Sequence, residues 1–220
     1  MKCSIAPAYV TCALAGVLVL HAQDASSSDS TRANALGHFA PMTLGQKYGW
    51  ASEKALGGPG LALVVLKASY DQTFNKPHQW GGDPESFAVR SASRFGRSFL
   101  RQNIAFGVRA LDGEDPRYFV SGHGSKWTRV KYAVVHTFEV RSDSGNWMPA
   151  YSVIVAAYAT PFLANQWRPD RHGAGWEFGV GTAGLGIAVG ANLCQEFWPD
   201  LRKKLGRHAS FLVRSSAAHQ

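Results

Sequence analysis

The sequence predicts an all-α protein, a Gly/Ala-rich helical bundle that ends in a helical hairpin. Three observations favour this fold class. Two long stretches, 147–167 and 175–198, are rich in small residues and uncharged over most of their length. Phenylalanines and arginines recur at helical spacing between Pro84 and Leu111. Capping residues and Gly/Pro breaks separate the segments as helix boundaries require.

The N-terminal residues have the pattern of a secretory signal. Lys2 is the only charge before Asp24, the residues between them are mainly apolar, and Ala22 provides a small residue at a cleavage point. An uncleaved anchor helix is the alternative. We therefore expect export to the periplasm or to a membrane of the outer envelope. The expected organisation is a signal peptide at 1–22, a disordered tether at 23–42, a helical domain at 43–205 and a flexible basic tail at 206–220.

Local signals place the boundaries of the first helices. Thr43 and Asp83 are expected N-caps, because each precedes an amphipathic segment. Gly57-Gly58 and Asp112-Gly113 are the expected ends. The helix that begins after Asp83 is the longest amphipathic element that the sequence predicts.

The segment from Ser125 to Asn146 admits two interpretations. Its apolar residues recur at three- and four-residue spacing after Ser125, which favours a capped helix. The part VKYAVVHTFEVR also alternates tolerably as a strand, and the following SDSGN would serve as a hairpin turn. We prefer the helix because its spacing extends over more residues.

The two uncharged stretches, 147–167 and 175–198, have tryptophans near their ends, and each is long enough to cross most of a bilayer as a helix. Pro161 would kink the first helix, so a hairpin buried in protein is an equal possibility. Alternation within 179–193 leaves an outer-membrane β-barrel as the alternative fold. The glycines predicted to pack the hairpin, because four-residue spacing lets helices approach closely, are Gly175, Gly179, Gly186 and Gly190.

The net charge of +8 predicts a basic surface that favours anionic partners. Four arginines of the segment 84–111 share one helix face, and a second basic cluster follows Pro199. We expect contact with a membrane surface or an anionic envelope polymer, the alternative being a solvated face. Nucleic acid is not an expected partner, because export separates the two. The predicted contact residues are Arg90, Arg94, Arg97, Arg101, Arg202, Lys203 and Lys204.

Groups that could carry out catalysis are few. The sequence has no GxSxG, Walker or HExxH motif, and we expect no metal and no cofactor. Glu114, Asp115 and His123 lie on one predicted loop and could perform acid–base chemistry. The expected function is therefore non-enzymatic, and the alternative is an envelope hydrolase acting on lipid or glycan. A different use for Asp115 or Asp200 is an ion pair with an arginine of the long helix.

Three short strings carry a resemblance. They are DPRYF (115–119), RSDSG (141–145) and EFWPDL (196–201). In this order and spacing the chain resembles a family of uncharacterised exported bacterial proteins over roughly residues 43–204. The family more often has Thr where this chain has Ser142. The resemblance implies a mainly helical, Gly/Ala-rich domain behind a signal peptide, and it implies no activity or ligand.

Overall fold

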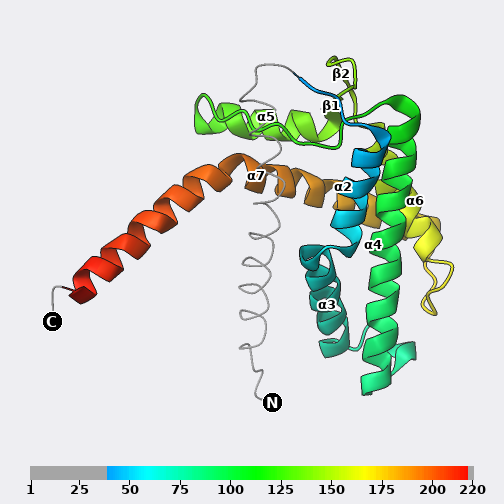
Figure 1. The fold of residues 1–220 in the computed structure, drawn as a ribbon. Coiled ribbons are helices and arrows are strands. Elements are labelled where there is room, and N and C mark those ends of the chain that lie inside the picture. Colours follow the sequence, from blue (N-terminus) through cyan, green and yellow to red (C-terminus); the bar gives the residue numbers. More distant parts are fainter. Residues whose placement is uncertain (1–38, 218–220) are drawn as a thin grey trace.

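Helices dominate the fold, which confirms the predicted all-α class (Figure 1). The structure, a computed structural model, describes residues 39–217, with side chains through Lys203. The predicted signal peptide and most of the predicted tether lie outside the described residues. The helices are α2 (Leu44–Leu56), α3 (Gly58–Thr73), the 3-10 turn η1 (His78–Trp80), α4 (Pro84–Asp112), α5 (Lys126–Phe138), α6 (Tyr151–Ala164) and α7 (Ala174–Ala217).

The predicted N-caps at Thr43 and Asp83 are confirmed. Thr43 and Gln46 exchange reciprocal hydrogen bonds between side chain and backbone, so they form a capping box. The Asp83 carboxylate accepts a hydrogen bond from the Ser86 amide at 2.7 Å. Gly113 ends α4 with a φ of 77°, a conformation that favours glycine. Figure 1 shows α2 and α3 along α4, and α6 also contacts it.

The ambiguous segment 126–149 contains both a helix and a hairpin. The helical interpretation is correct as far as Phe138. The strands β1 (Glu139–Arg141) and β2 (Trp147–Pro149) then pair antiparallel, and the SDSGN segment turns between them, as the alternative predicted. Gly145 supplies the positive φ of 86° that this turn requires. The helix ends because these turn residues let the chain reverse and pair with itself.

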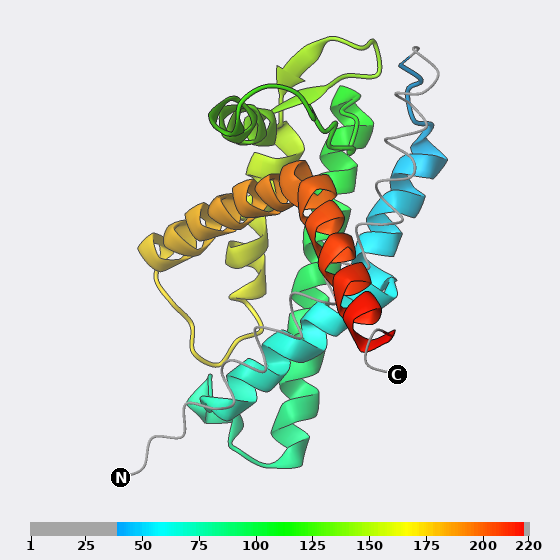
Figure 2. The same cartoon turned by 90° about the vertical axis from the view of Figure 1, so that its left-hand side faces the viewer.

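The helices α6 and α7 form the predicted C-terminal pair, and α7 crosses α6 (Figure 2). The start of the first helix is later than predicted: α6 begins at Tyr151, because Trp147–Pro149 belongs to β2. The two helices are in close contact at Gly181. A Cβ atom there would lie 2.4 Å from the Tyr158 ring, so only glycine fits without displacing that ring.

The predicted packing role of four glycines is wrong, since a Cβ on any of them would meet no neighbouring element within 4 Å. These glycines are Gly175, Gly179, Gly186 and Gly190. The packed face of α7 carries Gly181 and Gly184 instead, and a Cβ on Gly184 would lie 3.3 Å from Arg101 Nη1. The spacing identified residues that share a helix face, but spacing alone does not reveal which face meets a neighbour.

Helix α7 continues past the expected end of the hairpin. Pro199 lies within it, and the helix bends in its middle part (Figure 2). A proline removes one amide donor and crowds the carbonyl four residues earlier, which produces such bends. The backbone is helical to Ala217, so the helix extends into the segment 206–220. None of the helices within residues 39–217 is both long enough and apolar enough to cross a bilayer.

The DPRYF and EFWPDL strings meet at a buried carboxylate, that of Glu196, which is 0% exposed. The Tyr118 hydroxyl donates to it at 3.1 Å and Arg129 Nε at 2.9 Å. The backbone amides of Ser121 and Gly122 each donate at 3.0 Å. The charge of Glu196 is therefore fully hydrogen-bonded, as a buried carboxylate must be.

The RSDSG string joins the same framework through the backbone and through an ion pair. The Asp115 amide of DPRYF donates to the Arg141 carbonyl at 2.8 Å. Asp143 pairs with Lys47 of α2 at 2.7 Å, and the Lys47 side chain is almost fully buried. All three strings thus hold helices together.

We expect Glu196→Gln to lower the free energy of unfolding by about 3–5 kcal/mol, because it leaves the Arg129 guanidinium and two amides facing a neutral group. Urea unfolding followed by circular dichroism would measure this change. The control is Asp200→Asn, since Asp200 also pairs with Arg129 but its side chain is half exposed. We expect Asp200→Asn to lower the free energy of unfolding by no more than about 1 kcal/mol. Equal costs for the two variants would contradict the central role of Glu196.

Candidate anion-binding site

The first arginine of the predicted face, Arg90, binds a loop of the protein itself. Its side chain is fully buried, and its guanidinium donates five hydrogen bonds to the segment that links α3 to α4. The acceptors are the carbonyl oxygens of Lys76, Pro77 and Gly81 and the side-chain oxygens of Gln72 and Asn75. Arg90 is therefore held by acceptors of the protein and is buried away from any external surface.

The second arginine, Arg94, is also engaged internally. Its Nε and Nη2 atoms donate to the two oxygens of Asp71 in α3, at 2.5 and 2.7 Å. The prediction that Arg90 and Arg94 contact an anionic surface is thus wrong. Helical spacing placed them correctly on one face, but α3 and its following loop pack against that face and supply the acceptors.

The next two arginines of α4, Arg97 and Arg101, line a cavity of about 580 Å³, here named the Arg97 cavity. Lys54 of α2 and Lys67 of α3 add two further positive charges to its walls. The cavity is enclosed by α3, α4, α6 and α7. Its apolar wall is made of Leu63, Val64, Ala157, Pro161, Val180 and Ile187.

Arg94 also lines the Arg97 cavity and is paired with Asp71, but the other cations of the lining are held by no ion pair among the described residues. Asp71 and Glu177 lie near enough to favour the charges of Lys67 and Arg97 in part. Within the described residues, Lys67, Arg97 and Arg101 form no ion pair. Burial lowers the pKa of each of the three, and repulsion from neighbouring arginines lowers the pKa of Lys67 and Arg97 further. Each charge is therefore unfavourable in the folded protein. The buried Thr160 hydroxyl on the same wall also has no hydrogen-bond partner.

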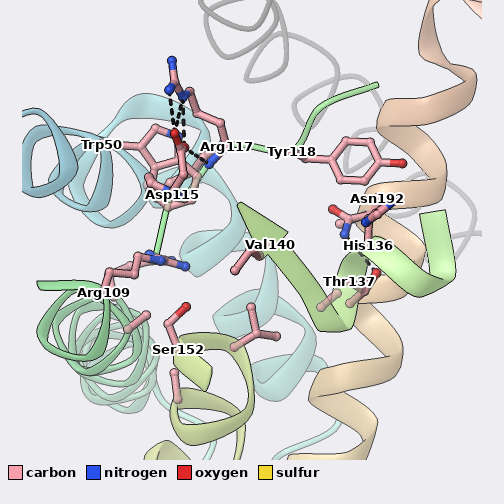
Figure 3. Close-up of a pocket in the computed structure, with 18 of the residues that line it drawn as sticks. Trp50, Arg109, Asp115, Arg117, Tyr118, His136, Thr137, Val140, Ser152 and Asn192 are labelled. Atoms are coloured by element: carbon pink, nitrogen blue, oxygen red, sulfur yellow. Dashed lines mark hydrogen bonds and ion pairs between the residues drawn. The ribbon is translucent and has the colours of Figure 1, made fainter. Parts of the chain in front are cut away.

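A second cavity of about 280 Å³, here named the Arg109 cavity, adjoins the first (Figure 3). Lys54, Arg101 and Gln102 line both cavities. Arg109 of α4 is buried in its wall, with the guanidinium carbon 5.1 Å from the centre of the Trp50 ring. Burial lowers the pKa of Arg109 to about 10. The molecule thus has two neighbouring cationic cavities that share Arg101.

The three catalytic candidates do not converge. Glu114 is buried, and its Oε1 accepts a hydrogen bond from the Ser152 amide at 2.9 Å, so it caps the start of α6. Asp115 is held by Arg117, with Nη2 at 2.5 Å. His123 is exposed and contacts the carbonyl of Ser121. Only Asp115 lines a cavity.

The combination of Glu114, Asp115 and His123 as an acid–base set is therefore wrong. Proximity in a loop did not predict that the two acids point into the protein while the histidine lies outside. The expected ion pair of Asp115 or Asp200 with an α4 arginine is also wrong, since Asp115 pairs with Arg117 and Asp200 with Arg129. Across the residues that the structure describes, no three His, Cys, Asp or Glu side chains lie close enough to hold a metal.

The remaining predicted contacts lie elsewhere on α7. Arg202 and Lys203 are exposed residues beyond Pro199, and neither lines a cavity. The side chain of Lys204 lies outside the described part of the chain. Arg202 and Lys203 are therefore exposed basic residues separate from the two cavities.

Four cationic residues of the cavities were missed by the sequence analysis: Lys54, Lys67, Arg109 and Arg117, the last of which is paired with Asp115. Arg109 follows Arg101 by eight residues, close to two helical turns, so continuing the arginine face along α4 would have included it. No such signal exists for Lys54 and Lys67. They belong to other helices, and only the packing of α2 and α3 on α4 brings them to the cavities.

Comparison with known proteins gives no assignment, since no family model, curated protein or solved structure matches the chain. The resemblance carried by DPRYF, RSDSG and EFWPDL stays a prediction. A functional proposal must therefore rest on the geometry and charge of the two cavities.

The lowered pKa of Lys67 predicts a pH-dependent effect on stability. Above its folded-state pKa the folded lysine is neutral, whereas the unfolded chain still binds a proton up to about pH 10.4. The fold therefore gains stability from this residue as pH rises through that window. We expect Lys67→Met to stabilise the fold relative to wild type most at about pH 7 and least at about pH 10, measured by urea unfolding.

Lys67→Arg serves as the control for this prediction, because arginine keeps its charge at both pH values. Its stability should fall further behind that of the wild type as pH rises. If the free energy of unfolding of each variant differs from that of the wild type by an amount that does not change with pH, the proposed repulsion within the Arg97 cavity is contradicted.

Proposed function

We propose that the protein binds an anionic amphiphile in the Arg97 cavity and catalyses no reaction on it. The observation that carries this proposal is the convergence of Lys67, Arg97 and Arg101 on one cavity, where none of the three forms an ion pair within the described residues. An anion placed among them would replace their mutual repulsion by attraction and raise their pKa values. The cost of burying these charges is then offset when the ligand is bound.

The apolar residues in the wall of the Arg97 cavity favour a ligand that has an apolar chain. Leu63, Val64 and Ile187 line the cavity together with the cationic residues, and the α7 wall includes the small residues Ala183 and Gly184. The volume of about 580 Å³ lies within the range of pockets that enclose small ligands. A lipid or fatty acid combines an anionic head with an apolar chain, whereas a polyanionic polymer would leave the apolar wall without a partner.

The predicted signal peptide and the basic residues of α7 fit the same proposal. A protein exported to the cell envelope would meet anionic lipids there. The exposed residues Arg202 and Lys203 would approach the headgroups, because basic residues near a bilayer are attracted to its negative surface potential. Export and membrane association are parts of the proposal.

The rival function, an envelope hydrolase, draws no support from the site. It requires Glu114, Asp115 and His123 to act on one substrate, but the first caps a helix, the second pairs with Arg117 and the third is exposed. The two cavities offer cations and hydrogen-bond donors, which favour binding of an anion.

Ligand binding can be tested with dodecanoate by isothermal titration calorimetry, below its micelle concentration. We expect dodecanoate to bind, and Arg97→Met/Lys67→Met to weaken binding at least about tenfold, because hydrogen bonds to charged groups contribute about 1.5–3 kcal/mol each. Dodecyl maltoside, which has the same chain and a neutral head, should bind much more weakly.

The matched control is Lys126→Met/Lys131→Met, which removes two positive charges from the exposed side of α5. It should bind dodecanoate like the wild type. Equal weakening in both double variants would show that net charge alone determines binding. Equal binding of dodecanoate and dodecyl maltoside would overturn the role of the cations.

Membrane association is tested by cell fractionation. We expect the mature protein in the membrane fraction at low salt and its release at about 0.5 M salt, because screening shortens the range of surface electrostatics to a few ångströms. Arg202→Glu/Lys203→Glu should shift it to the soluble fraction even at low salt. A wild-type protein wholly soluble at low salt would rule out the proposed membrane contact.

A further inference from the structure

The Arg109 cavity has features that the amphiphile proposal does not use. It lies where α2, α4, α5, α6 and α7 meet the DPRYF loop, and its volume of about 280 Å³ is half that of its neighbour. Figure 3 shows Arg109 and Ser152 on one side of it, and His136, Thr137 and Asn192 on the other. Small side chains, among them Ala105 and Ala156, keep the space between these polar groups free.

Arg109 brings a buried charge to this cavity with an unused donor. The residue is 7% exposed, and its Nη1 has no hydrogen-bond partner in the described part of the protein. Glu114, Asp112 and Asp115 lie near enough to favour the charge of Arg109, but none forms an ion pair with it within the described residues. Glu114 Oε1 caps α6 and Asp115 is paired with Arg117, whereas Glu114 Oε2 and Asp112 Oδ2 have no hydrogen-bond partner there. A buried guanidinium normally has acceptors for its donors, so an acceptor from outside the chain fits here.

Ser152 adds a second unused donor on the same side of the cavity. It is 1% exposed, and its hydroxyl has no partner in the described part of the protein, although its amide is bonded to Glu114. Arg101 lines the cavity with a second positive charge. Three guanidinium groups and a hydroxyl therefore line this space, and the carboxylate in its lining, that of Asp115, is paired with the third arginine, Arg117.

We propose that the Arg109 cavity binds a phosphate group, either free or as the end of a small monoester. The planar guanidinium of Arg109 matches two phosphate oxygens, and the Ser152 hydroxyl donates to a third. Arg101 provides the second charge that a dianion requires. This site shares Arg101 with the proposed amphiphile site but is otherwise built from different donors, because Arg97 and Lys67 do not line it and Arg109 and Ser152 do not line the Arg97 cavity.

The test is calorimetric titration of the full chain with inorganic phosphate and with glycerol 3-phosphate, in a buffer without other oxyanions. We expect at least one of them to bind, and glycerol not to bind. Arg109→Met should raise the Kd at least about tenfold and Ser152→Ala about threefold, because both remove a donor to a charged oxygen. Lys126→Met changes net charge like Arg109→Met and should leave the Kd unchanged.

The two phosphate compounds distinguish the source of the group. Stronger binding of inorganic phosphate would identify free phosphate as the ligand, and stronger binding of glycerol 3-phosphate would identify a monoester. Either result supports the site. Binding of neither compound, or an unchanged Kd in both Arg109→Met and Ser152→Ala, would overturn it. Ser152→Ala keeps every charge and its amide bond to Glu114, so it tests the site even if Arg109→Met fails to fold.

The phosphate proposal and the amphiphile proposal can be contradicted separately, because different variants should lose the two ligands. Arg97→Met/Lys67→Met should lose dodecanoate binding and keep phosphate binding. Ser152→Ala should weaken phosphate binding and keep dodecanoate binding. If phosphate binding instead follows Arg97 and Lys67, the phosphate occupies the larger cavity and the assignment to the Arg109 cavity is wrong.

Discussion

The arrangement of this protein depends on the buried carboxylate of Glu196. It lies on α7, and all four of its donors come from α5 or from the loop at 118–122. A carboxylate without water must keep such donors, because losing them costs several kcal/mol, so α7 is held at one position relative to this loop. The earlier turns of α7 then cross α6 and supply Ala188 and Ile187 to the walls of the two cavities. The buried acid Glu196, of a residue type that often indicates catalysis, here fixes the helix that forms part of the cavity walls.

The arginines of α4 show how one helix face serves two purposes. Arg90 finds carbonyl oxygens in a loop, and Arg94 finds Asp71. Further along the helix, Arg97, Arg101 and Arg109 form no ion pair within the described residues. Where an arginine stabilises the fold, the acceptors of its hydrogen bonds come from the protein itself. For the arginines that lie partly buried beside a cavity without such acceptors, we infer that a ligand supplies them.

Much of the fold could be predicted from the sequence because its signals are local. Thr43 and Asp83 mark helix starts through hydrogen bonds within one turn, and SDSGN marks a reversal by its own turn chemistry. The extent of α5 was harder to predict, because its pattern fits a helix and a strand until the hairpin partner is known. The wrong glycines were chosen for a related reason, since a helical repeat does not show which side meets Tyr158.

The site could be predicted only in part, and the limit is physical. Helical spacing showed that four arginines share one face of α4. It could not show that Arg90 and Arg94 are bound by acceptors of the protein, whereas Arg97 and Arg101 are not. That difference depends on α3 and its loop, which are distant in sequence and supply acceptors to the first pair only. Lys67 reaches the cavity from α3 for the same reason. The acids Glu114 and Asp115 were misread because their partners, an amide of α6 and the Arg117 guanidinium, determine their orientation.

The uncompensated cations also explain why ligand binding and stability should be linked in this protein. Burial lowers the pKa of Arg97, Arg101 and Arg109, so each charge destabilises the fold relative to the unfolded chain. A ligand that binds only the folded state at one hundred times its Kd adds about 2.7 kcal/mol of stability. Such a contribution is a large fraction of the total for a domain of this size. Filling these positions with apolar residues would stabilise the fold alone, so the cations are best explained by an anion that completes the structure when it binds.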